Sequence, residues 1–306
     1  MNRLSLYVFS VCLFLGMRTE IIIAQGLQYL KQTPPGLKPE VFAPGIISKE
    51  NESEFGSVFN KEATEFYYGV DIDGKSEIRF TRLVDQTWTA PQLLLSYEKF
   101  SCNDPFLSPD ENRLYFISNR SLDGTDSKDD YDIWYIEREG NGWNTRMKNA
   151  GPNINSPKNE YYMSFTSEGT MYFSSNVMAT EDKSHDFNIY VTEYINGEYQ
   201  KALPPSDSIN TKAYEADVFV SPDESFVIFC SIRKEGFGQG DLYISFKDAA
   251  GNWSKAKNMG AVINTAGHEL CPFVTQDGKY FFYTSSRDIY WVDAAIIKVF
   301  KKYKTK

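Results

Sequence analysis

The sequence predicts an all-β fold, a five-bladed β-propeller built from four-stranded antiparallel blades. Three observations carry this prediction: an aromatic-rich composition, a motif that recurs at a regular spacing, and a connector that recurs almost unchanged. The 306 residues include 22 Phe, 20 Tyr and 5 Trp, which suits half-buried pleated strands better than long helices. The alternative is a six-bladed ring, in which the sequence of one repeat is no longer recognisable.

The motif begins with a tight turn, which leads into an aromatic strand. Four copies align well and a fifth is weaker, opening at Ser108, Thr166, Ser221, Thr275 and Asn60. The aromatic residue near the end of each strand is Tyr68, Phe116, Phe173, Phe229 or Tyr283, so the steps are 48, 57, 56 and 54 residues. This period fits a four-stranded blade with long loops.

Further strands follow in each copy. A third strand opens on an acid or amide, at Glu77, Asp132, Asn188, Asp241 and Asp288. A fourth strand opens on an aromatic residue, which we expect to pack between blades, at Trp88, Trp143, Tyr199 and Trp253. The connector then appears as 154–156 (Ile-Asn-Ser), 209–211 (Ile-Asn-Thr) and 263–265 (Ile-Asn-Thr).

The last copy stops near Val292, without a fourth strand or a connector. The segment 37–47 has the same ten-residue step as Trp253 to Ile263. The N-terminal segment is therefore predicted to complete the last blade, which leaves no open edge where a strand could mispair. The propeller is expected to span residues 37–297.

The combination of Ser-Pro-Asp turn, aromatic strand, Asp-Ile-Tyr strand, Trp strand and Ile-Asn-Thr connector resembles the repeat of the TolB-type, WD-like propellers. It covers about residues 37–292. Members of that family commonly bind proteins in the bacterial envelope. The resemblance therefore implies a protein- or peptide-binding module there.

The two ends of the chain read differently from the repeats. Residues 1–24 resemble a signal peptide cut after Ala24, with an uncleaved anchor as the alternative. Residues 25–36 form a leader, and residues 298–306 a basic tail that we expect to fray. The prediction is a periplasmic, secreted or cell-surface protein with no membrane span after cleavage.

The net charge limits the classes of partner, and the cysteine count limits the possible disulfides. The net charge of −9 argues against nucleic acid, which needs a basic face, and favours basic proteins or cations. Cys12 would leave with the signal, so Cys102, Cys230 and Cys271 cannot all pair within one chain. The two histidines complete no recognised catalytic motif.

Six acidic residues are the candidate site. Counting back six residues from each turn gives Glu54, Cys102, Glu160, Glu215 and Glu269, and Asp104 and Asp217 follow two residues later in their blades. Strand alternation places them on the face of the long loops 119–131, 176–187 and 232–240, at the mouth of the channel. They could bind a cation or a basic segment, or they could accept hydrogen bonds from the connectors as struts between blades.

The leading hypothesis is a non-catalytic exported propeller that binds a protein or peptide through this acidic mouth. The alternative is a carbohydrate-active, glycosidase-like enzyme, which would need two carboxyl groups facing each other across a pocket. Carbohydrate is therefore the alternative ligand. No cofactor is expected, and Ca²⁺ in the channel is the one metal considered.

Overall fold

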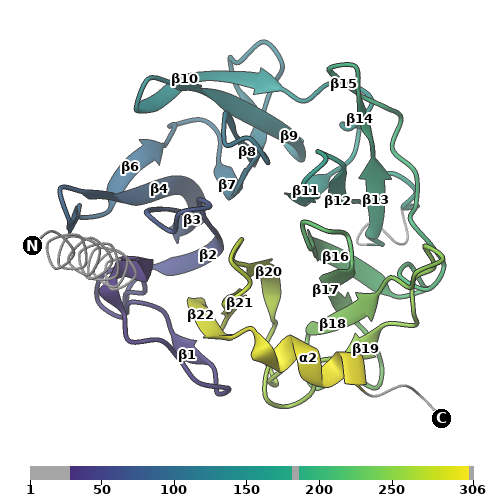
Figure 1. The fold of residues 1–306 in the computed structure, drawn as a ribbon. Coiled ribbons are helices and arrows are strands. Elements are labelled where there is room, and N and C mark those ends of the chain that lie inside the picture. Colours follow the sequence, from purple (N-terminus) through teal and green to yellow (C-terminus); the bar gives the residue numbers. More distant parts are fainter. Residues whose placement is uncertain (1–27, 181–185, 303–306) are drawn as a thin grey trace, which may run out of the picture.

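The computed structural model describes residues 28–180 and 186–302. They form five small antiparallel sheets around a central axis, as predicted (Figure 1). The strands of blade 1 are β2 (Ser53–Phe59), β3 (Glu65–Ile72), β4 (Lys75–Val84), β5 (Thr87–Trp88) and β6 (Gln92–Leu95). Those of blade 2 are β7 (Cys102–Leu107), β8 (Arg113–Arg120), β9 (Ser127–Glu139) and β10 (Gly142–Asn149).

The other three blades repeat this order with a shorter or displaced outer strand. Blade 3 contains β11 (Glu160–Phe165), β12 (Met171–Ser175) and β13 (Asn188–Thr192), followed by the hairpin β14 (Tyr194–Ile195) and β15 (Glu198–Tyr199). Blade 4 contains β16 (Tyr214–Val220), β17 (Phe226–Ile232), β18 (Asp241–Phe246) and β19 (Lys257–Asn258). Blade 5 contains β20 (Leu270–Val274), β21 (Tyr280–Ser285), β22 (Asp288–Asp293) and β1 (Glu40–Val41).

The predicted split blade is confirmed. Strand β1 pairs antiparallel with β22, with Glu40 opposite Trp291 and Val41 opposite Tyr290. Phe42 follows and is fully buried among rings from blades 1 and 5. The two ends of the chain therefore close the ring with both hydrogen bonds and apolar packing.

Burial decreases from the axis outward. Every residue of β12, a second strand, is buried, because neighbouring blades cover both of its faces. All eight residues of β10, an outermost strand, are at least partly exposed. This gradient explains why the second strands carry the aromatic and aliphatic residues of the repeat, whereas an outer strand such as β10 is mostly polar.

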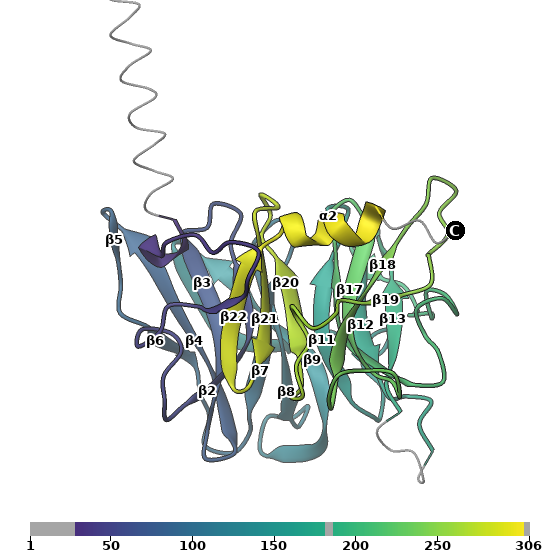
Figure 2. The same cartoon turned by 90° about the horizontal axis from the view of Figure 1, so that it is seen from below.

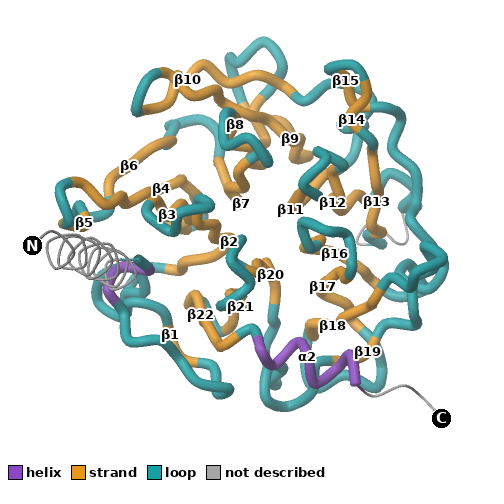
Figure 3. The backbone as a smooth tube through the Cα atoms, viewed as in Figure 1, coloured by secondary structure: helices purple, strands orange, loops and turns teal. Residues whose placement is uncertain are grey.

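Both described helical segments lie outside the sheets (Figure 3). The turn η1 (Tyr29–Lys31) lies within the predicted leader, and Tyr29 packs edge-on against Phe59 and Tyr280. The predicted basic tail does not fray over its first part. It forms α2 (Ala295–Lys302) instead, which buries Ile296 and Ile297 and reaches Lys257 in blade 4. The proposed signal, residues 1–24, and residues 303–306 lie outside the described residues.

The ring has two unlike faces. Figure 2 shows α2 and the β4–β5 turn at one face and the β8–β9 loop at the other. We call the second one the long-loop face, because it carries the loops between second and third strands and the connectors between blades. Among the described residues, no helix is long and apolar enough to cross a membrane.

Candidate functional site

Three of the predicted glutamates are struts in this structure. The carboxylates of Glu160, Glu215 and Glu269 are fully buried, and each accepts two hydrogen bonds from the last residue of the preceding connector. For Glu269 these come from the Thr265 amide at 2.9 Å and the Thr265 hydroxyl at 2.7 Å. The side chains therefore turn sideways into the connectors and tie each blade to the one before it.

A serine at the end of the second strand completes each strut. Ser175, Ser231 and Ser285 donate to Glu160, Glu215 and Glu269 at 2.8, 3.2 and 2.7 Å. In blade 2 the same place holds Cys102, whose thiol lies 3.9 Å from the Ser118 hydroxyl. The thiol takes the place of the carboxylate, since this blade follows a connector without the Ile-Asn-Ser/Thr sequence.

Glu54 is the exception among the glutamates. Val70 faces it on the second strand, so it lacks the serine, and its Oε2 atom has no hydrogen-bond partner. Its Oε1 atom accepts only from the Lys49 amide, at 3.2 Å. Burial raises the pKa of Glu54 to about 7. Burial also raises the pKa of Glu160 to about 7, against the opposing effect of its hydrogen bonds from Ser156.

Asp104 and Asp217 belong to a different ring. In each blade, the pairing of the innermost strand with the second strand is interrupted by a β-bulge. The residue two places after the strut position has a left-handed backbone conformation. These residues are Gly56, Asp104, Tyr162, Asp217 and Cys271, with φ of 48°, 51°, 35°, 52° and 51°. Because a bulge redirects a side chain, this ring is turned away from the connectors.

The members of this bulge ring meet one another near the axis. The Cys271 thiol donates to Asp104 Oδ1 at 3.6 Å, although the two residues are 167 positions apart. A Cβ atom on Gly56 would come within 2.4 Å of the same Oδ1 atom. Only glycine therefore leaves room for Asp104 at this point.

Both aspartates are nine-tenths buried, and their carboxyl groups hold protons more tightly than usual. Burial raises the pKa of Asp104 to about 7, partly offset by the Cys271 thiol. Burial and the charge of Asp104 raise the pKa of Asp217 to about 8, partly offset by the Cys271 amide. This pair is the part of the predicted acidic mouth that the structure brings together.

Tyr162 fills the channel beside these acids. Its side chain is fully buried, and its hydroxyl donates to the carbonyl oxygen of Pro272 at 2.9 Å, from blade 3 to blade 5. Phe106 packs edge-on against it. These contacts hold the Tyr162 side chain at the level of the bulge ring.

An aromatic ladder lies on the long-loop face, next to the acids. Tyr131 lies in β9, because the predicted loop 119–131 is shorter and β9 already begins at Ser127, whereas Phe187 ends the long loop before β13. Tyr161 and Tyr214 lie at the start of two innermost strands. Ring centroids follow one another at 5.7 Å (Tyr131–Tyr161), 4.9 Å (Tyr161–Phe187) and 5.6 Å (Phe187–Tyr214). Burial and the charges of Tyr131, Asp104 and Asp217 raise the pKa of Tyr161.

No three His, Cys, Asp or Glu side chains converge as a metal-binding set within the described ranges. The three cysteines of those ranges, Cys102, Cys230 and Cys271, are buried free thiols. The Cys230 sulfur lies 3.3 Å from His268 Nε2. The expectation of Ca²⁺ in the channel therefore rests on the sequence alone.

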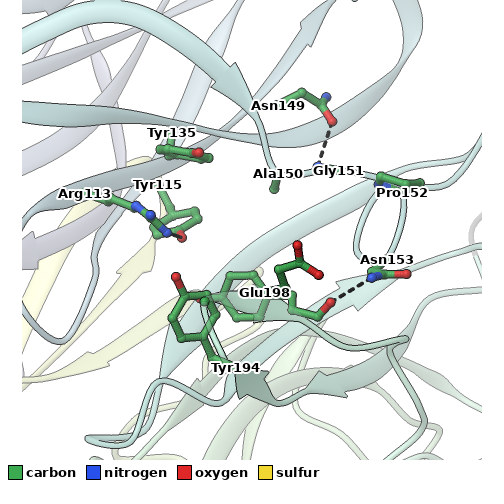
Figure 4. A pocket seen from close by; sticks show the side chains of 12 residues that line it. Arg113, Tyr115, Tyr135, Asn149, Ala150, Gly151, Pro152, Asn153, Tyr194 and Glu198 are labelled. Carbon is green, nitrogen blue, oxygen red and sulfur yellow. Dashed lines mark hydrogen bonds between the residues drawn. The ribbon is translucent and has the colours of Figure 1, made fainter.

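A second candidate site lies on the outer rim, between blades 2 and 3, and was not predicted from the sequence. A cavity of about 250 Å³ is lined by Arg113, Tyr115 and Tyr135 from blade 2 and by Tyr194, Glu198 and Tyr199 from blade 3. Figure 4 shows the Arg113 guanidinium beside the hydroxyls of Tyr115 and Tyr194 at one end, with Glu198 toward the other. We call it the rim pocket.

No protein-family model matches the chain, and no curated protein sequence matches it. Solved structures do: TolB from Acinetobacter baumannii superposes with a TM-score of 0.50 at 14% identity, over 80% of this chain and 55% of that one. The fold is that of a TolB-type β-propeller.

Two further solved structures superpose on this chain with similar scores. A protein of unknown function from Dyadobacter fermentans gives a TM-score of 0.51 at 14% identity, over 85% of this chain and 83% of that one. A chain of the nidogen/laminin complex gives 0.50 at 13% identity, over 82% and 80%. The chain spans little more than half the length of the Acinetobacter TolB. At such identities the likeness concerns the fold.

Proposed function

We propose that this chain is an exported, non-catalytic propeller that binds a protein or peptide in the bacterial cell envelope. The observation that carries the proposal is the aromatic ladder on the long-loop face, whose Tyr214 lies on the same strand, β16, as Asp217. Acids beside tyrosine rings suit a Lys or Arg side chain, which gains both ionic and cation–π contacts. Tyrosine is also enriched at the centres of protein interfaces.

The glycosidase alternative has fewer candidate catalytic carboxyl groups in the structure than in the sequence. Three of the glutamates already accept two or more hydrogen bonds each within the ring, and all four are fully buried. Among the described residues, Asp104 and Asp217 remain of the six predicted acids, and burial together with the charge of Asp104 raises the pKa of Asp217. The proposed binding surface therefore consists of these two acids and the ladder, without the strut glutamates.

Lysine-reactive crosslinking in native cells tests which face binds. The long-loop face carries the exposed Lys99, Lys158, Lys212 and Lys234, whereas Lys61 and Lys279 lie on the opposite turns. We expect crosslinks to one partner from the first group, and their loss in an Asp104→Asn/Asp217→Asn variant that still folds. Crosslinks confined to Lys61 and Lys279, or unchanged by the variant, would contradict the proposed face.

Export is tested separately, at the N-terminus of the protein as cells make it. We expect mass spectrometry of the periplasmic or released fraction to find a chain that begins at Gln25. A chain that retains Met1 and sediments with the membranes would show the uncleaved anchor instead.

A further inference from the structure

The rim pocket differs from the two neighbouring blade junctions because no glutamate lies between its tyrosine hydroxyl and its cation. At the junction of blades 1 and 2, the carboxylate of Glu65 accepts from the Tyr67 hydroxyl at 2.8 Å and from Arg138 at 2.5 and 3.1 Å. A tyrosine hydroxyl, a glutamate carboxylate and a basic side chain of the next blade thus form one hydrogen-bonded unit.

The junction of blades 3 and 4 contains the same unit, with the glutamate from another position. Glu224 accepts from the Tyr172 hydroxyl at 2.5 Å and from Lys247 at 2.6 Å. Tyr172 and Tyr67 hold the same place, each one residue before the repeated aromatic of its second strand. Two of the junctions therefore place a glutamate side chain between a tyrosine hydroxyl and a cation.

The rim pocket has the phenol and the cation but neither glutamate. Tyr115 occupies the place of Tyr67, while Arg113 stands where blade 1 has Glu65. Gly169 stands where blade 4 has Glu224, since both amides donate to the residue that opens their turn. Tyr194 stands where blade 2 has Arg138, each being the sixth residue after the one that opens the third strand.

The Arg113 guanidinium consequently makes its contacts with neutral groups, because Glu137, which lies opposite it on β9, pairs with Lys148 instead. The guanidinium donates to the Tyr115 hydroxyl at 3.3 Å and lies 5.0 Å from the centre of the Tyr135 ring. It is half-buried and makes no ion pair, whereas Arg79, Arg138 and Arg233 of the described residues each pair with a glutamate. A partly desolvated guanidinium favours an anion that can take its parallel donors, above all a carboxylate.

We propose that the rim pocket binds an acidic side chain of a polypeptide, whose carboxylate lies between Arg113 and the hydroxyls of Tyr115 and Tyr194. The volume of about 250 Å³ accommodates one such side chain. The chain itself supplies the precedent, because glutamate fills the equivalent place at the two adjacent junctions. This site goes beyond the proposed function, since it lies on the rim and selects the opposite charge from the axial acids.

The test uses the full chain and two peptides, Ac-Ala-Glu-Ala-NH₂ and Ac-Ala-Gln-Ala-NH₂, titrated by NMR. We expect the glutamate peptide to bind at least tenfold more tightly than the glutamine peptide, and Arg113→Gln to remove this preference. Equal binding of the two peptides, or a preference that survives in Arg113→Gln, would overturn the proposal.

Two further variants test the proposal if Arg113→Gln folds poorly. Tyr194→Glu supplies the missing acid from within, as Glu65 does for Arg138, so it should block the peptide and raise the melting temperature. Lys247→Gln is the matched control, because it removes the cation of the adjacent junction and should bind the peptide like the wild type. A Tyr194→Glu protein that folds and still binds would contradict the assignment.

A Glu198→Gln variant and a titration with glucuronate test the charge and the class of the ligand. Glu198 lines the other end of the pocket, so Glu198→Gln should leave peptide binding unchanged or strengthen it. Weaker binding would mean that the site selects a cation. Glucuronate that binds through Arg113, without binding of the glutamate peptide, would assign the pocket to a glycan and overturn the polypeptide proposal.

Discussion

The hydroxyl of Tyr162 in blade 3 donates to the carbonyl oxygen of Pro272 in blade 5 at 2.9 Å, across the axis of the ring. Both groups are buried, and the contact joins two blades that are not neighbours in sequence. Tyr162→Phe would leave the Pro272 carbonyl without this donor, which should cost about 1–3 kcal/mol of unfolding free energy. Urea unfolding measures the loss, and an unchanged midpoint would show that the ring does not depend on this contact.

The strut glutamates should be stabilising, and Glu54 provides their control. Glu269→Gln places an amide donor where three donors converge, so about 1–3 kcal/mol of unfolding free energy should be lost. Glu54→Gln should cost less, since the Oε2 atom of Glu54 has no partner and burial raises its pKa to about 7. Thermal melting of the two variants at pH 7 compares them directly, and equal losses would contradict the distinction.

The axial acids predict that stability falls as pH rises. Burial raises the pKa of Asp104 to about 7 and that of Asp217 to about 8 from an ordinary value of 3.8. The folded protein therefore binds more protons than the unfolded chain between about pH 4 and pH 8, and its stability decreases across that window at up to about 1.4 kcal/mol per pH unit for each group. Glu54 and Glu160 act in the same direction up to about pH 7.

Asp217→Asn should reduce this slope, because the asparagine side chain does not ionise. Denaturant unfolding at pH 5, 6, 7 and 8 measures it, with Asp248→Asn as an exposed control whose carboxyl has a lowered pKa. A slope equal to that of the wild type between pH 6 and pH 8 would show that Asp217 is ionised in the folded protein. Binding of a basic segment should strengthen over the same pH range, since it favours the ionised acids.

Ring closure should depend on Phe42. This side chain is fully buried and lies 5.1 to 5.9 Å from the ring centres of Phe59, Phe66, Phe282 and Trp291. Phe42→Ala should cost about 3–5 kcal/mol, whereas Leu37→Ala, at a side chain that is 57% exposed, should change stability little. Calorimetry of both variants tests the closure, and a small effect of Phe42→Ala would mean that blade 5 is stable without it.

Much of this architecture could be predicted because the same sequence pattern recurs in every blade. The aromatic second strands, the Trp and Tyr residues of the fourth strands and the missing outer strand of the last copy are all visible along the chain. The helix α2 was not predicted, since its basic residues suggested a frayed end and the apolar face of Ile296 and Ile297 depends on the neighbouring blade. The rim pocket was missed because Arg113 and Tyr194 lie on different blades.

The sequence by itself determined the strand order of the blades and the closure by residues 37–47, and it favoured five blades over six, because each blade is a local pattern of alternating residues and turns. Only the tertiary structure decided the role of each acid. Glu160 and Asp217 look alike in the sequence, yet one turns into its connector and the other toward the axis. The difference arises from the bulge in each innermost strand, which sends residues only two positions apart to separate surroundings.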